Sequence, residues 1–99
     1  MNRFIKEIMI KTAYVLTHEY TCLTSGTQVH CLGRFGAKVW VFKDGTYNMY
    51  LDLGKCDANK YKFVLNEYRE LAENLALLGR CGQIRKLFDR LQTMAGKHH

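Results

Sequence analysis

The sequence predicts an α+β fold in which helices pack on one face of an antiparallel sheet. A hairpin pattern at residues 37–53 indicates the sheet, and apolar residues recur at helical spacing on either side of it. The 99 residues are enough for one domain, since a chain of this length buries roughly two-thirds of the surface that its unfolded form exposes. We therefore expect a single domain, 1–99. Its predicted elements are an N-terminal helix, a three- to four-stranded antiparallel meander and two C-terminal helices packed on one face.

The sheet is predicted around a β-hairpin. Asp44-Gly45 lies between two runs rich in aromatic and β-branched residues, and Asp-Gly supplies the positive φ angles of a two-residue type I′ turn. In the first run valines alternate with Trp40 and Phe42, and Tyr50 follows on the second run, so both faces of the hairpin carry bulky side chains. A sheet with two such faces is either covered on both or uses one for a partner.

The segment before the hairpin predicts another strand. Residues 27–32 alternate as a strand does, whereas residues 17–25 are either irregular or a short strand. Residues 33–36, GRFG, match the GxxG loop with which KH domains clamp nucleic acid. That loop joins two helices, whereas a strand pattern follows this one. We expect a turn that presents Arg34 and Phe35 to solvent.

Helical spacing of apolar residues predicts the N-terminal helix at residues 2–16. A strand through residues 8–16 is the alternative, because β-branched residues are common there.

Two further helices are predicted at residues 58–78 and 83–95. Asp57 is a candidate N-cap for the first of them, and Gly79 suits the left-handed position that follows a helix. The main apolar stripe of this helix should lie on the sheet. Phe63 and Leu77 fall on its opposite side, where the last helix is expected to cover them.

The excess of positive charge is concentrated near the C-terminus. The chain carries 15 Lys and Arg against 9 Asp and Glu, a formal net charge of +6. From Arg80 onward the only acid is Asp89, so this segment holds most of the excess. Such a bias favours nucleic acid, an anionic surface or an acidic protein patch as partner, and a solvated basic face is the alternative.

The last predicted helix is basic on one side and apolar on the other. Its apolar face either closes the core, forms a homodimer with its own copy, or docks into a groove or onto a membrane surface. In each case the basic side chains remain exposed. The candidate contacts for phosphate or an acidic partner are Arg80, Arg85, Lys86 and Arg90, with Arg34, Lys38 and Lys43 near the sheet.

Residues that could support catalysis or metal binding form no known motif. The internal histidines, His18 and His30, lie in no nucleophile pattern, and zinc drawn on them with Cys22 and Cys31 lacks the usual paired-ligand spacing. We expect no enzyme activity, no metal and no cofactor. His98 and His99 are either native or the remnant of a tag and carry no functional weight.

The cysteines and the hydropathy suggest a cytoplasmic protein. Four widely spaced cysteines without a CxxC motif, and without a convincing secretory signal, are read as free thiols in a reducing compartment. No apolar run approaches the length that spans a bilayer, so we expect no membrane partner.

Two functional hypotheses follow. The first is a small, non-catalytic, basic protein that binds nucleic acid through the cations named above. The second is a protein inhibitor or adaptor, of the small kind that phages and mobile elements encode, that blocks a host nucleic-acid-handling protein. Its partner surface would be either the aromatic sheet face of Trp40, Phe42 and Tyr50 or the turn tip at Arg34 and Phe35.

Overall fold

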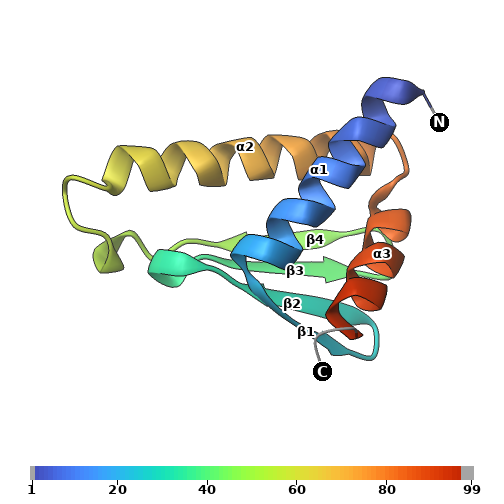
Figure 1. Cartoon of the computed structure of the whole chain (residues 1–99), viewed down its shortest axis with the longest axis horizontal. Helices are drawn as coiled ribbons and strands as arrows, with labels where there is room; N and C mark the ends of the chain where they lie inside the picture. Colours follow the sequence, from blue (N-terminus) through green and yellow to red (C-terminus); the bar gives the residue numbers. More distant parts are fainter. Residues whose placement is uncertain (1, 97–99) are drawn as a thin grey trace.

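The fold places three helices on one side of a four-stranded sheet, as a computed structural model shows for residues 2–96 (Figure 1). Lys97 and the two terminal histidines lie outside the described residues. The predicted fold class is confirmed. The elements in chain order are α1 (Arg3–Glu19), β1 (Thr21–Ser25), β2 (Gln28–Leu32), the 3-10 turn η1 (Arg34–Gly36), β3 (Lys38–Phe42), β4 (Tyr47–Tyr50), the 3-10 turn η2 (Leu53–Lys55), α2 (Tyr61–Arg80) and α3 (Ile84–Gly96).

The sheet is an antiparallel meander in the order β1-β2-β3-β4. Val29, Cys31, Val39 and Val41 point to one face and are fully buried. Helices α1 and α3 pack on this face and cross in front of the strands in Figure 1. The alternation read from the sequence is therefore correct, and only one face of the sheet is covered by the described helices.

Helix α1 begins with a side-chain cap and is longer than expected. The side-chain oxygen of Asn2 accepts a hydrogen bond from the backbone N–H of Ile5 at 2.8 Å, which satisfies a donor that has no partner inside the helix. The helix ends at Glu19, beyond the predicted Leu16. The alternative strand through residues 8–16 is wrong, because the buried residues of this segment follow a helical spacing.

Helix α3 uses its apolar face to complete the core. Ile84, Leu87, Phe88 and Leu91 are each at most 1% exposed. Burying a side chain of this size contributes about 1.5–3 kcal/mol relative to leaving it in water. Of the three interpretations of this face, core closure is the one the packing supports, and a homodimer through α3 has only its polar side available.

Helix α2 differs from the prediction at its start and in its packing. It begins at Tyr61, and Asp57 instead caps the preceding turn by accepting a hydrogen bond from the N–H of Lys60 at 2.9 Å. The buried side of α2 joins the common core, but its main neighbour is α1 rather than the sheet. Leu77 is partly buried against the core, whereas Phe63 is 60% exposed, so the last helix does not cover Phe63.

The conformations of the glycines in the hairpin and after α2 differ from those predicted. The hairpin loop has three residues, 43–45, because Val41 pairs with Tyr47 and the N–H of Phe42 donates to the carbonyl of Thr46. Only Gly45 there has a positive φ, of 97°, which is the pattern of a type I turn followed by a bulge rather than a type I′ turn. After α2 the left-handed residue is Gly82, with φ 69°, and Gly79 remains helical.

The cysteines are not all free thiols. Cys22 on β1 lies directly opposite Cys31 on β2, and their sulfurs form a disulfide. Cys56 and Cys81 are free. The expectation of a reducing compartment rested on free thiols and loses this support, since disulfides are rare in the cytosol.

The turn between β2 and β3 depends on a small residue at position 33. A Cβ atom on Gly33 would lie under 3.0 Å from atoms of the half-buried Tyr20 ring. We expect Gly33→Ala to lower the free energy of unfolding by about 1–3 kcal/mol, the usual effect of overpacking. Urea unfolding followed by circular dichroism measures it.

Gly79→Ala is the matched control. A Cβ there would meet only Ile84 Cγ1, at 3.7 Å, inside a helix that favours alanine over glycine. Its stability should be unchanged or raised by up to about 1 kcal/mol. Equal stabilities for Gly33→Ala and the parent would contradict the close packing of Tyr20 on this turn.

Candidate functional site

The second face of the sheet, called the open face here, carries aromatic, apolar and basic side chains. Its strand positions are half-buried or exposed. The register places on this face Thr21, Leu23, Ser25, Gln28, His30, Leu32, Lys38, Trp40, Phe42, Asn48 and Tyr50. None of these eleven strand positions is an Asp or Glu. The face is therefore a candidate surface for an anionic or an apolar partner.

Trp40 lies in the middle of the open face between two cross-strand neighbours. On β2 the ring of His30 stacks parallel to the indole, with ring centroids 4.8 Å apart and planes inclined by 9°. On β4 the residue opposite is Asn48, which is exposed. His30 thus covers one side of the indole, and the other side borders a short polar residue.

Tyr50 continues the open face at the edge strand. Its side chain is 52% exposed, and the Nζ atom of Lys38, directly opposite on β3, lies 5.9 Å from the ring centroid. A cation–π contact of this kind contributes about 0.5–1 kcal/mol at an exposed site. The contact holds a cation beside an exposed aromatic ring.

At the other end of β3, cations from the sheet and from α3 come together. Lys43 and Arg85 line one surface hollow beside Phe42. Asp44 also lines it, and its carboxylate accepts hydrogen bonds from the hydroxyl and the N–H of Thr46 at 2.6 and 3.0 Å, which lower its pKa. The hollow therefore holds two cations against one ionised carboxylate.

The remaining basic residues of the C-terminal segment lie on the solvent side of the helices. Arg80, at the end of α2, is exposed, as are Lys86 and Arg90 on α3. Arg90 lines a shallow hollow with Asp89 and Thr93. The structure thus leaves all the predicted cations of this segment free to meet a partner.

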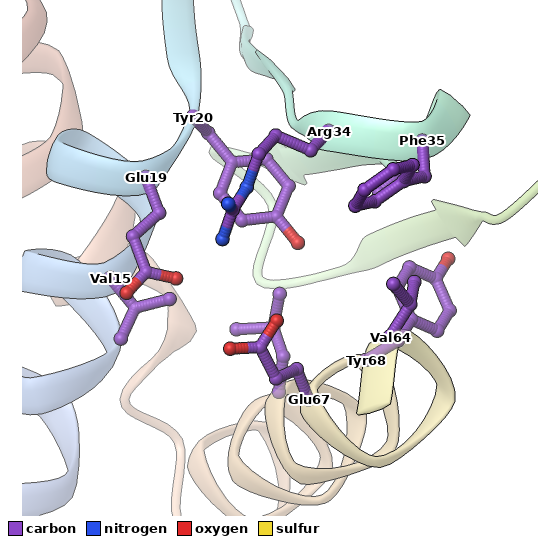
Figure 2. Close-up of a pocket in the computed structure, with 10 residues that line it drawn as sticks. Val15, Glu19, Tyr20, Arg34, Phe35, Val64, Glu67 and Tyr68 are labelled. Atoms are coloured by element: carbon purple, nitrogen blue, oxygen red, sulfur yellow. The ribbon is translucent and has the colours of Figure 1, made fainter. Parts of the chain in front are cut away.

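Arg34 and Phe35 do not join the open face. They turn toward α2 and line a pocket with the end of α1 (Figure 2). Phe35 has a left-handed backbone, with φ 57°, and the Nζ atom of Lys60 lies 5.5 Å from its ring centroid. The expectation that the turn presents both side chains to solvent is correct for Arg34, but Phe35 is half-buried.

The pocket in Figure 2 brings together titratable groups that sequence reasoning missed. Burial is the main cause that raises the pKa of Tyr20 and of Tyr68 to about 12. Glu19 and Glu67 raise the pKa of Tyr20 further, and Arg34 opposes them. Both tyrosines are therefore protonated at neutral pH. No local sequence motif predicts this cluster, because its residues come from α1, η1 and α2, which are distant in the sequence.

The size of that pocket limits its chemistry. Its volume of about 40 Å³ exceeds the roughly 10–15 Å³ that one water needs, but it leaves no room for a substrate. Neutral tyrosines are also poor general bases at pH 7. The pocket fits a structural role in holding the β2–β3 turn against α2.

The histidines and cysteines considered for zinc do not form a metal site in the described structure, and they make other contacts instead. His18 stacks on Tyr14 with ring centroids 3.9 Å apart, and Cys22 is in the disulfide. Among residues 2–96 no three His, Cys, Asp or Glu side chains gather in a metal-binding group.

Within residues 2–96, no helix combines the length and apolar character needed to cross a membrane.

No family model, curated protein or solved structure matches this chain. The geometry of the surfaces is therefore the basis for any functional proposal.

The raised tyrosine pKa values predict a loss of stability at high pH. The unfolded chain releases these protons near pH 10, whereas the folded protein holds them to about pH 12. The folded state thus binds more protons in this window, and the free energy of unfolding should fall as pH rises from 10 to 12. Urea unfolding at several pH values measures the slope.

Replacing both tyrosines tests the assignment. The double variant Tyr20→Phe, Tyr68→Phe should lose stability less steeply over this range than the parent, while Tyr14→Phe, at a ring 57% exposed, should follow the parent. Parallel curves for the double variant and the parent would show that the two hydroxyls are not responsible.

Proposed function

We propose that this protein is a small, non-catalytic nucleic-acid-binding protein that contacts phosphates through the outward side of α3 and the adjoining end of β3. The observation that supports this most is the meeting of Arg85 with Lys43 beside Phe42. It brings one cation of the C-terminal segment, Arg85, to the edge of the aromatic open face. Arginine and lysine side chains are the usual phosphate contacts of proteins that bind nucleic acid.

The charge distribution supports the same proposal. Arg80, Arg85, Lys86 and Arg90 are exposed, and Asp89 is the one acidic residue that accompanies them in the described part of this segment. Because α3 buries its apolar face in the core, its basic face is fixed toward solvent. Arg34 is not part of the proposed surface, since it lies near Glu19 and Glu67 in the pocket of Figure 2.

A protein partner is the second candidate. Leu23 on β1 and Leu32 on β2 are 45% and 38% exposed, and they lie on the open face to one side of the aromatic residues of β3 and β4. Protein interfaces have apolar, aromatic centres of this kind. The protein would then act as an inhibitor or adaptor that blocks a nucleic-acid-handling protein.

Salt dependence tests the first proposal. Titration against duplex DNA, single-stranded DNA and RNA at about 50 and 200 mM salt should show affinity that falls steeply, by a log–log slope of about 0.7–0.9 per phosphate contacted. The triple variant Arg85→Ala, Lys86→Ala, Arg90→Ala should bind more weakly and reduce that slope by roughly two to three units.

A second triple variant controls for total charge. Lys6→Ala, Lys62→Ala, Arg69→Ala removes three exposed cations from α1 and α2 and gives the same net charge. Its salt slope should remain close to that of the parent. Equal losses in the two triple variants would mean that overall charge, and not the α3 surface, determines binding.

The two candidates differ in their response to charge on the open face. Leu23→Lys with Leu32→Lys should leave nucleic-acid affinity unchanged or raise it, because the change adds two positive charges and removes none of the proposed phosphate contacts. A protein contact centred on these leucines would be lost. Weaker nucleic-acid binding by this double variant would count against the first candidate.

A further inference from the structure

We propose that the open face binds unpaired bases of a single-stranded nucleic acid, with one base stacked on the side of the Trp40 indole that faces Asn48. This inference rests on the proposed function and names the class of nucleic acid. The reasons are the orientation of Trp40, the polar and aromatic residues next to it, and the placement of charge.

Trp40 offers one side of its ring and has the other already occupied. The parallel ring of His30, at 4.8 Å between centroids, covers one side and fixes the direction of the indole. On β4 the residue opposite Trp40 is the short, exposed Asn48, and Trp40 itself is half-buried, so the indole keeps part of its surface in contact with solvent. A flat ring of the size of a base fits on the side of the indole away from His30, where base stacking on an aromatic ring is favourable.

Asn48 and Tyr50 extend the site along β4. The carboxamide of Asn48 has both a donor and an acceptor, which suits the mixed hydrogen-bonding edge of a base. Tyr50 lies two residues further on the same face, about 7 Å away at strand spacing, with about half of its side chain exposed. It offers a second ring for the next base, and Lys38 at that ring provides a cation for the backbone.

The charges around the open face suit a phosphate backbone. Lys38 begins β3, and Lys43 with Arg85 lies just past its other end, roughly 17 Å away along an extended strand. The open-face positions between them carry no carboxylate. A strand that crosses the sheet would thus meet cations at both ends and aromatic rings between them.

A duplex cannot use these rings. Its base faces are stacked inside the helix, so a sheet face reaches only the backbone and the groove edges. The rings of Trp40 and Tyr50 gain a partner only when the bases are unpaired. This is why the open face favours a single strand over a duplex.

The fluorescence of Trp40, the one tryptophan of the chain, reports stacking directly. The protein is titrated at about 50 mM salt with a short oligothymidylate, with its duplex with oligoadenylate, and with an abasic strand of equal length. Oligothymidylate should quench the fluorescence, and it should bind about five- to 150-fold more tightly than the abasic strand, the usual range for one stacked base. The duplex should bind without quenching.

Tyr50→Ala removes one proposed stacking ring at an exposed position. Its affinity for oligothymidylate should fall by about fivefold or more, with no change for the abasic strand. Phe63→Ala is the matched control, because it removes a ring that is 60% exposed on α2, away from the sheet. It should bind as the parent does.

The possible failures are distinguishable. Equal affinity for oligothymidylate and the abasic strand, without quenching, would overturn stacking on the open face but leave the phosphate contacts of α3 in place. Absence of binding to every strand at low salt would overturn both, and would direct attention to a protein partner for the open face.

Discussion

Burial of one face of the sheet is the constraint on which the rest of the structure depends. Four residues on two central strands, Val29, Cys31, Val39 and Val41, are fully enclosed by α1 and α3. Because side chains alternate along a strand, fixing these four inward forces their neighbours outward. The placement of the aromatic residues on the open face is therefore a consequence of the same alternation that builds the core.

The amphipathic character of α3 connects that core to the charged surface. Its leucines and Phe88 complete the core, so its arginines and lysine lie on the opposite side of the helix and point to solvent. The position of α3 over the sheet then brings Arg85 to the end of β3, next to Lys43. Packing on one side of the helix thus determines where the positive charge of the chain is presented.

Local sequence patterns predicted most of the helices and strands, whereas contacts that depend on long-range pairing could not be predicted from the sequence. Alternating residues identified the hairpin and helical spacing identified α3, because both signals lie within a few neighbouring residues. The disulfide between Cys22 and Cys31 depends on how β1 pairs with β2, and residues 17–25 gave no clear strand pattern from which to infer it. The cluster of Tyr20 and Tyr68 joins elements distant in sequence, so no spacing rule reveals it.

The placement of the aromatic residues in the candidate site likewise could not be predicted from local patterns alone. From the sequence, Phe35 at the turn tip and Trp40 on the sheet were alternative partner surfaces, but the left-handed backbone at Phe35 turns its ring toward α2. For Trp40, cross-strand pairing places the ring of His30 parallel to the indole, which no single-strand pattern could show. An indole already held by its neighbour loses less freedom when a ligand binds, and this lowers the entropic cost of binding. The stacked pair therefore makes the half-buried Trp40, rather than the more exposed Tyr50, the natural centre of the open face.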